Sequence, residues 1–148
     1  MTQSVLSVKG LRVSFPTPDG RARAVQDVGF DLGRGETLGI VGESGSGKTV
    51  TALSIMGLVP RPGEIEAGSI ELNGENLRRL GERRLRQVRG SEIGMIFQEP
   101  MTSLHPTLRV GFQIAEAIRA HDGVISREEV RARVEALLDR VGIPDART

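Results

Sequence analysis

A glycine-rich segment at residues 42–49 constrains the fold of this chain more than any other feature. It reads GESGSGKT and matches the pattern G-x-x-x-x-G-K-[ST]. A short apolar run at Thr37–Val41 precedes it, and apolar residues with helical spacing follow it over Lys48–Leu58. This order of strand, loop and helix predicts a P-loop, whose backbone N–H groups surround a phosphate.

Each position of the loop has a chemical reason. Gly42, Gly45 and Gly47 permit backbone conformations that turn N–H groups inward around the phosphates. Lys48 supplies a positive charge to the β- and γ-phosphates, and Thr49 offers a hydroxyl to Mg²⁺. The candidate nucleotide-binding residues are therefore Gly42, Glu43, Ser44, Gly45, Ser46, Gly47, Lys48, Thr49 and Val50.

The remaining pattern indicates an α/β fold, with a P-loop NTPase core beside an antiparallel β region. Apolar alternation or short apolar runs predict strands at Val5–Lys9, Leu11–Phe15, Ala24–Leu32, Thr37–Val41, Ser69–Leu72 and Ile93–Phe97. The pair Asn73-Gly74 predicts a turn after the fifth of these strands. Helical spacing predicts helices at Lys48–Leu58, Leu77–Arg89 and Val110–Ala120. A capping-box pattern at Ser126–Glu129 opens a further helix through Val141, which Pro144 ends.

Composition excludes several classes of function. The chain contains no cysteine, which rules out disulfides, thiolate metal sites and a cysteine nucleophile. Its formal net charge is +1, so no strong overall field favours nucleic acid or a membrane surface. No apolar run approaches the ~20 residues needed to span a bilayer, and Met1–Gly10 lacks the pattern of a secretory signal. We expect a soluble or peripheral protein on the cytoplasmic side.

Further motifs narrow the class of P-loop protein. The segment Met95–Leu104 reads MIFQEPMTSL and follows an apolar run, and Ser54–Leu58 reads SIMGL. Together with the P-loop, these segments resemble the ATP-binding subunits of ABC transporters, most closely the dipeptide and oligopeptide import branch. The resemblance covers the whole chain, including Gly111–Ile114 and Val141–Asp145.

The resemblance implies roles for residues outside the P-loop. Gln98 corresponds to the Q-loop glutamine, which contacts Mg²⁺ and the attacking water, so it is a candidate catalytic residue and metal ligand beside Thr49. From the residues alone, Gln98 is a polar side chain at the carboxyl end of a strand, and a plain capping amide is an equal alternative. Phe15 lies where the family places an aromatic ring against adenine. The alternative is that Phe15 is ordinary strand core.

The resemblance also implies a function and partners. A family member binds Mg-ATP and couples its hydrolysis to peptide import, together with membrane-spanning permease subunits and a second ATP-binding subunit. It would lie peripherally at the cytoplasmic face of the membrane. Residues 99–113 would receive a coupling helix of the permease, and apolar side chains in this loop suggest a partner surface.

Two expected parts of the family pattern are not found in this sequence. Neither a Leu-Ser-Gly-Gly signature nor an apolar strand ending in Asp-Glu occurs, and the family places both after the position of Thr148. The expected fold is therefore a P-loop core truncated before the signature motif. Residues 1–97 would form the β region and P-loop core, and residues 98–148 the Q-loop and the start of the helical subdomain. We expect residues 1–148 alone to turn over ATP poorly.

Two other functions stay open. One is a nucleotide-binding module that does not hydrolyse ATP. The other is a soluble ABC protein that acts on nucleic acid, suggested by an arginine-rich stretch over residues 78–89. We favour a solvated helix face for this stretch, because acidic residues lie nearby and no aromatic residues interleave. No nucleic-acid partner is therefore expected.

Overall fold

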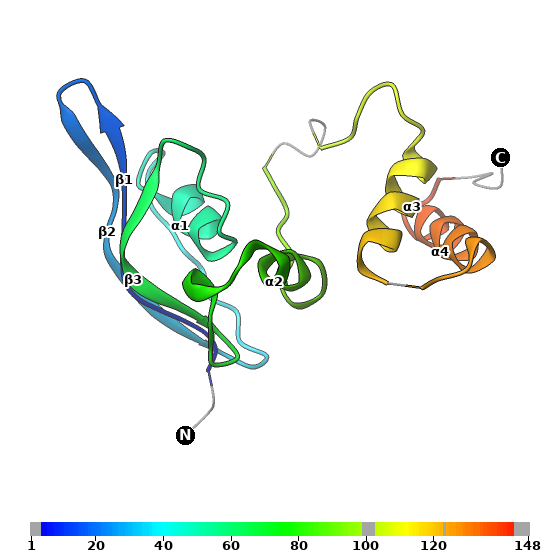
Figure 1. Ribbon diagram of the computed structural model, residues 1–148, viewed down its shortest axis with the longest axis horizontal. Coiled ribbons are helices and arrows are strands. Elements are labelled where there is room, and N and C mark those ends of the chain that lie inside the picture. The colour runs from blue at the N-terminus through cyan, green and yellow to red at the C-terminus, as the bar shows by residue number, and fades with distance from the viewer. Residues whose placement is uncertain (1–3, 99–102, 123, 144–148) are drawn as a thin grey trace. The chain divides into compact units, whose positions relative to one another are not determined.

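The computed structural model describes residues 4–98, 103–122 and 124–143. The chain divides into two units, Met1–Arg86 and Gln87–Thr148 (Figure 1). The first contains the sheet and the P-loop, and the second contains a helical pair. The predicted boundary between residues 97 and 98 separates segments by function rather than by compactness, and it stays a prediction.

The first unit is built on an antiparallel sheet with strand order β2-β1-β3-β4. The strands are β1 (Ser4–Thr17), β2 (Gly20–Gly33), β3 (Glu64–Leu72) and β4 (Glu75–Asn76). Its buried side chains are mostly aliphatic and include Val8, Leu11, Val13, Val25 and Ile70. The predicted antiparallel β region is confirmed, and the predicted strands at Ala24–Leu32 and Ser69–Leu72 lie within β2 and β3.

The two strands predicted at Val5–Lys9 and Leu11–Phe15 are one strand, β1, with a break in its pleat. Its register against both neighbours shifts just after Val8 and Lys9. At this level Gly10 has a φ of +58°, and Gly68 on β3 has a φ of +98°. A Cβ at Gly68 would lie 2.7 Å from the carbonyl oxygen of Gly10, so only glycine fits. The shift reverses the alternation of side chains, which explains the interrupted sequence pattern.

The turn predicted at Asn73-Gly74 is confirmed. It joins Leu72 of β3 to Glu75 of β4, which are paired in the sheet. Both turn residues have positive φ, +50° at Asn73 and +83° at Gly74. Positive φ at both central positions is what a two-residue type I′ hairpin requires, and Asn-Gly adopts it at low cost.

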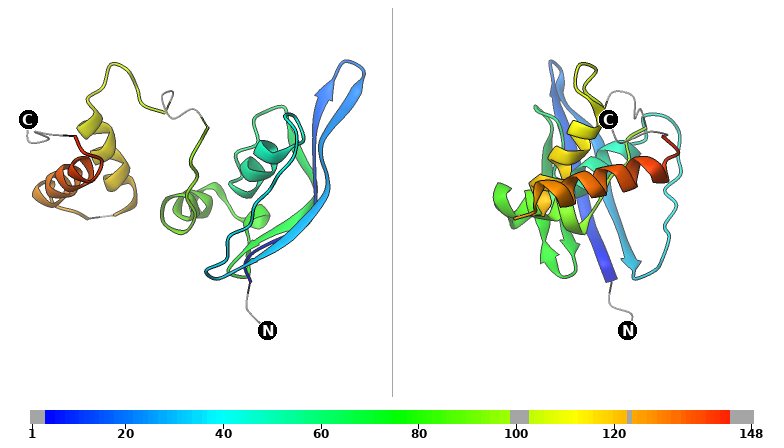
Figure 2. Two further views of the ribbon diagram at one scale, coloured as in Figure 1. Left: turned by 180° about the vertical axis from the view of Figure 1, so that it is seen from behind. Right: turned by 90° about the vertical axis from the view of Figure 1, so that its right-hand side faces the viewer.

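The helix after the P-loop, α1 (Lys48–Ile55), lies against the sheet (Figure 2). It ends earlier than the predicted Leu58, and the residue that ends it is Gly57 rather than the later prolines. Gly57 has a φ of +62° and its N–H donates to the carbonyl of Ser54 at 3.0 Å. The N–H of Leu58 donates to the carbonyl of Leu53 at 2.8 Å. These two bonds form a Schellman motif, a common helix C-terminus.

The single helix predicted over Leu77–Arg89 is wrong. The structure has a 3₁₀ helix η1 (Leu77–Arg79), a short α2 (Glu82–Gln87) and a π-helical turn η2 (Val88–Glu92). Gly81 separates the first two, and glycine is among the poorest helix formers. The helical spacing on which the prediction relied did not compensate for the low helix propensity of Gly81.

The predicted core strands Thr37–Val41 and Ile93–Phe97 are not strands within the described residues. Their apolar side chains are largely exposed, with Val41 at 92% and Ile96 at 96%. A strand buried on both faces needs hydrogen-bonded neighbours and covering layers. No described segment pairs with either run, so neither forms a ladder.

The second unit contains two packed helices, α3 (Val110–His121) and α4 (Arg127–Arg140). Its buried cluster consists of Ala115, Val130, Val134 and Leu138. Both helices were predicted, although α4 ends at Arg140 rather than Val141. Its terminus is again a Schellman motif, in which Gly142 with φ +76° donates to the carbonyl of Asp139 at 3.0 Å. Pro144, the predicted stop, lies outside the described residues.

The predicted capping box at the start of α4 is confirmed. The backbone N–H of Glu129 donates to the Ser126 hydroxyl at 3.2 Å, and the Ser126 N–H donates to the Glu129 carboxylate at 3.0 Å. Hydrogen bonds from the side chain and then the backbone of Ser126 lower the pKa of Glu129. The carboxylate form is thus favoured by folding of the helix terminus.

Ser126→Ala should cost about 1 kcal/mol of stability at neutral pH, the usual loss for a helix N-cap. The wild-type cap should also weaken in acid. Because the pKa of Glu129 is lowered by folding, its contribution is complete at pH values above the ordinary pKa of a glutamate. That contribution is lost as pH falls through the lowered folded pKa of Glu129.

Urea unfolding followed by circular dichroism, repeated from neutral pH down into this acid range, measures both effects. Ser103→Ala, at an exposed serine outside the helix, is the control. Equal acid sensitivity in Ser126→Ala and wild type would contradict the assignment.

Candidate nucleotide-binding site

The P-loop runs into the N-terminus of α1, and two of its glycines adopt left-handed backbone conformations. Gly45 has a φ of +81° and Gly47 a φ of +91°. A Cβ at Gly45 would meet open space, so this glycine is needed only for its conformation. A Cβ at Gly47 would lie 2.3 Å from the carbonyl oxygen of Ala24, so this glycine is needed for its conformation and for space.

β2 therefore packs against the P-loop at Gly47. Besides the Ala24 carbonyl, the Val25 side chain lies 3.5 Å from where a Gly47 Cβ would stand. Val25 is itself buried, at 4% exposure. Sequence reasoning did not find Ala24 and Val25 as supports of the loop, because the contact joins segments far apart in the chain.

The ammonium group of Lys48 lies over the loop. It donates to the carbonyl oxygens of Gly42 and Glu43, both at 2.7 Å, and to the Ser46 hydroxyl at 3.3 Å. All three ammonium protons thus have acceptors within the loop. The predicted residues Gly42, Glu43, Ser46 and Lys48 are brought together in one local cluster around a positive charge.

The start of α1 has the properties of an anion site. Gly47 is the N-cap and makes no side-chain cap hydrogen bond, and the first turn contains no acidic residue. The first N–H groups of the helix, at Lys48, Thr49 and Val50, therefore carry the partial positive charge of the helix terminus. Thr49 is exposed on this turn. A phosphate here would gain the N–H groups and the helix dipole together.

Phe15 lies near the end of β1, opposite Ala22 of β2. Its ring is half-buried and packs over Gly63, the residue before β3. The predicted stacking of Phe15 on adenine stays a prediction, and the alternative of a strand-core role is only partly met because the ring keeps an accessible surface.

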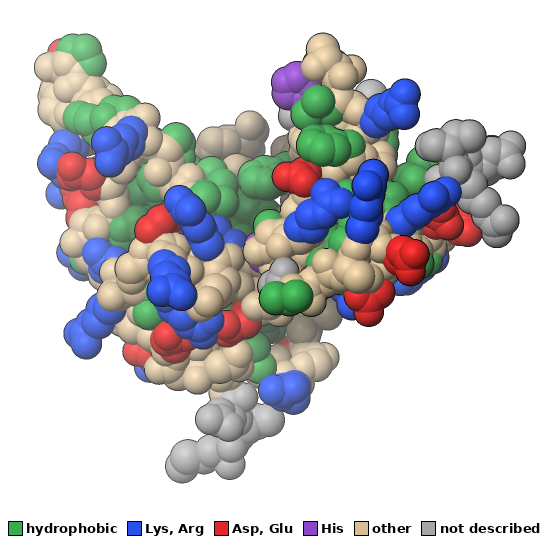
Figure 3. All heavy atoms as spheres, turned by 45° about the vertical axis from the view of Figure 1, so that its right-hand side comes forward, with side chains coloured by type: hydrophobic (Ala, Val, Ile, Leu, Met, Phe, Trp, Pro, Cys, Tyr) green, Lys and Arg blue, Asp and Glu red, His purple; other side chains and the backbone are tan. Residues whose placement is uncertain are grey.

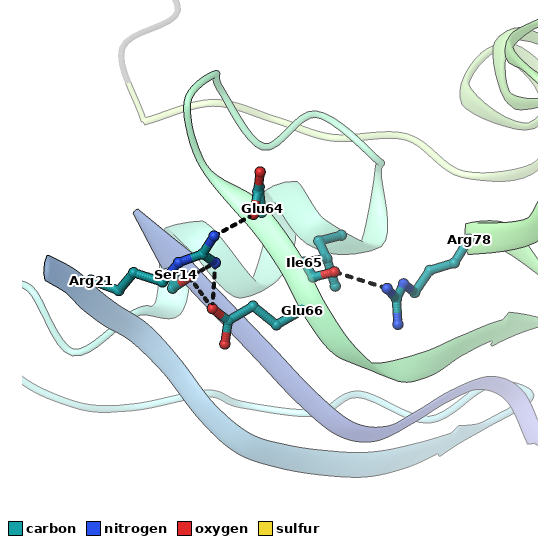
Figure 4. A network of polar contacts seen from close by, with 6 residues as sticks. All are labelled: Ser14, Arg21, Glu64, Ile65, Glu66 and Arg78. Atoms are coloured by element: carbon teal, nitrogen blue, oxygen red, sulfur yellow. Dashed lines mark hydrogen bonds and ion pairs between the residues drawn. The ribbon is translucent and has the colours of Figure 1, made fainter. Parts of the chain in front are cut away.

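An ion network joins β1, β2 and β3 around Ser14, the residue before Phe15 (Figure 4). Arg21 of β2 contacts Glu66 at 2.8 Å and Glu64 at 3.1 Å, both on β3. Between them, the Ser14 hydroxyl of β1 donates to Glu66 at 2.5 Å. The Ser14 hydrogen bond, and secondly that from Arg21, lower the pKa of Glu66. This network joins the ends of the three long strands.

Gln98 belongs to the second unit, where it is exposed on a bend. The P-loop belongs to the first unit, so the predicted sharing of Mg²⁺ between Thr49 and Gln98 stays a prediction. Of the predicted partner surface at 99–113, residues 99–102 lie outside the described residues. In the described part, Leu104 is 48% and Phe112 50% exposed.

The Gln113 side chain holds this loop in shape. It accepts from the His105 N–H at 2.8 Å and donates to the carbonyls of His105 at 3.1 Å and Leu108 at 2.9 Å. Three hydrogen bonds from one amide fix the turn that exposes Leu104 and Leu108. Sequence reasoning did not single out Gln113 for this role.

Several arginines of the basic stretch contact the protein itself. Arg78 donates to the carbonyl of Ile65 at 2.8 Å (Figure 4), and Arg84 contacts Glu75 at 2.6 Å. Basic and acidic side chains are intermixed on the face shown in Figure 3. These contacts give Arg78 and Arg84 a structural role, and the solvated-face interpretation of the stretch stays a prediction.

The glycine-lined loop, the lysine over it and the open helix terminus define a P-loop protein of the nucleotide-binding class. Residues 25–148 match the family model described as ABC transporter. The chain belongs to the ABC transporter family.

Curated relatives of similar sequence include transport ATP-binding proteins for peptides. The dipeptide transport ATP-binding protein DppD of Lactococcus lactis subsp. cremoris is 49% identical, over 97% of this chain and 41% of the relative. The oligopeptide transport ATP-binding protein OppD of Bacillus subtilis is 51% identical, over 95% of this chain and 39% of the relative. The chain thus spans about two fifths of the length of these relatives.

Solved structures support the fold assignment. The ATP-binding cassette MJ0796, in a dimeric post-hydrolysis state bound to ADP and Pi, matches with a TM-score of 0.74 and 26% identity. The match covers 90% of this chain and 56% of that one. The predicted fold class, α/β with a P-loop core beside an antiparallel β region, is confirmed. No helix in the described ranges is long and apolar enough to cross a membrane.

Proposed function

We propose that this chain binds Mg-ATP and, within a complete transporter, couples ATP hydrolysis to peptide import. The observation that carries the proposal is the P-loop cluster, in which the Lys48 ammonium contacts the Ser46 hydroxyl and two loop carbonyls, next to a helix start with no acidic residue. The names of relatives that transport dipeptides and oligopeptides supply the substrate class.

The residues present suit the proposed ligand. Lys48 would exchange its loop acceptors for the β- and γ-phosphates, and the N–H groups of the first turn of α1 would bind phosphate oxygens. Thr49 and Gln98 offer a hydroxyl and an amide oxygen, the hard oxygen ligands that Mg²⁺ prefers. When bound, Mg²⁺ would neutralise charge that develops on the phosphates.

The proposed partners are membrane-spanning permease subunits and a second ATP-binding subunit. A location at the cytoplasmic face of the membrane follows from these partners. The exposed side chains of Leu104, Leu108 and Phe112 support a docking surface for a permease, because apolar residues cluster on one loop and the adjoining helix. A dimer is supported by the dimeric cassettes that share the fold.

The direct test is an ATP titration of residues 1–148 with and without Mg²⁺. We expect Mg²⁺ to tighten binding and Thr49→Ala to remove that increment, by roughly tenfold for one lost oxygen ligand and its hydrogen bonds. Thr17→Ala, at an exposed threonine at the end of β1, serves as control. ATP binding that does not respond to Mg²⁺ would contradict the metal assignment, and absence of ATP binding would contradict the proposed function.

A further inference from the structure

We infer that Gly63 is a positioning residue for adenine recognition. Because glycine has no side chain, it leaves the space that the Phe15 ring occupies. The inference rests on the proposed function, since it takes Phe15 as the surface on which adenine stacks. It adds a residue to the nucleotide site that no motif in the sequence indicates.

The close approach of the two residues is the first observation. A Cβ on Gly63 would lie 2.4 Å from Cε1, 2.8 Å from Cζ and 2.9 Å from Cδ1 of Phe15. Three ring atoms therefore occupy the volume that any other residue at position 63 would fill. Such distances are far below van der Waals contact, so one of the two groups would have to move.

The second observation is that the backbone of Gly63 does not itself require glycine. Gly63 is not among the described glycines with positive φ, and its N–H closes a turn by donating to the Pro60 carbonyl at 2.9 Å. An alanine could adopt this conformation without backbone strain. The need for glycine thus comes from the ring of Phe15.

The third observation is that the flanking strands are held in register. Ser14 and Glu64, the neighbours of Phe15 and Gly63, are paired across β1 and β3. Arg21 contacts both of them, the Ser14 hydroxyl at 3.3 Å and the Glu64 carboxylate at 3.1 Å. The backbone cannot easily slide to make room, so a side chain at position 63 would displace the ring.

A displaced ring would no longer present the same face to a base. Aromatic groups stack favourably in offset or edge-to-face arrangements, so the interaction depends on the position and angle of the ring. Gly63 packs against part of the Phe15 ring, and the half-buried ring keeps the rest of its surface accessible. Gly63 would therefore affect binding of the base while leaving the phosphate site unchanged.

The test uses a single tryptophan as reporter. The chain contains no Trp and no Tyr, so Phe15→Trp gives one clean fluorophore at the site. ATP should quench its emission, whereas inorganic tripolyphosphate should bind the P-loop without quenching. Adding Gly63→Ala should abolish the quench and weaken ATP binding roughly fivefold, with tripolyphosphate affinity unchanged. Gly81→Ala is the matched control, because its added Cβ would meet open space and its φ is not positive.

Quenching and ATP affinity that stay the same in the Gly63→Ala background would overturn the inference and leave the proposed function intact. If the Phe15→Trp protein without the second substitution bound neither ATP nor tripolyphosphate, the proposed function and this inference would both be contradicted. Should Gly63→Ala lower the thermal unfolding midpoint, combining it with Phe15→Ala should restore the midpoint by removing the ring. Failure of that double variant to recover would place the cause outside the ring and would also overturn the inference.

Discussion

Lys48→Ala should weaken ATP binding by roughly 100-fold, because it removes a charge-assisted interaction with the phosphates worth about 1.5–3 kcal/mol in total. The ammonium of Lys48 already lies among the loop atoms at 2.7 Å from two carbonyls, so it is positioned to meet the phosphates. Lys48→Met would keep most of the aliphatic stem and should lose nearly as much affinity, which assigns the loss to the charge.

Lys9→Ala is the matched control for this experiment. Lys9 carries the same side chain on β1 and is exposed, so its removal changes net charge by the same amount. Calorimetric ATP titration at constant ionic strength compares the variants. Similar losses for Lys9→Ala and Lys48→Ala would show that a general charge effect, rather than the P-loop, governs binding.

Gly47→Ala should abolish measurable ATP binding and lower stability by about 2–4 kcal/mol. Two costs add at this position, a φ of +91° that suits glycine and a Cβ placed 2.3 Å from the Ala24 carbonyl oxygen. Because the obstacle is backbone of β2, it cannot turn away as a side chain would. The loop would have to leave β2 and lose its shape.

Gly45→Ala separates the two costs. Its φ of +81° is similarly unfavourable for alanine, but its Cβ would meet open space. We expect a smaller loss of about 1 kcal/mol and weakened but measurable ATP binding. Thermal unfolding and ATP titration of both variants measure the difference. Equal effects at the two positions would mean that the contact with β2 does not support the loop.

Local features of this chain could be predicted from its sequence because their causes are local. The P-loop, the Asn73-Gly74 hairpin and the capping box at Ser126 each depend on a few consecutive residues whose conformations or hydrogen bonds are closed among themselves. The ends of α1 and α4 could also have been predicted, because a glycine with positive φ, here Gly57 or Gly142, commonly ends a helix. The prediction instead relied on the prolines that follow later in the chain.

Features that depend on distant segments could not be predicted in this way. The runs at Thr37–Val41 and Ile93–Phe97 are apolar, yet a strand forms only when another segment supplies its ladder. The contact of Gly47 with Ala24 and that of Gly63 with Phe15 likewise join positions that no local pattern relates. The role of Gln98 depends on the family resemblance, and its place beside the P-loop stays a prediction.

The hydrogen bonds of Lys48 within its own loop bear on which ligands the proposed site would bind. A ligand of Lys48 would have to replace the two carbonyls and the hydroxyl that accept hydrogen bonds from its ammonium group. A small monovalent anion offers too little in exchange, whereas a triphosphate brings several negative charges and also reaches the N–H groups of α1. For the proposed nucleotide site, this competition would favour a polyphosphate over a simple anion.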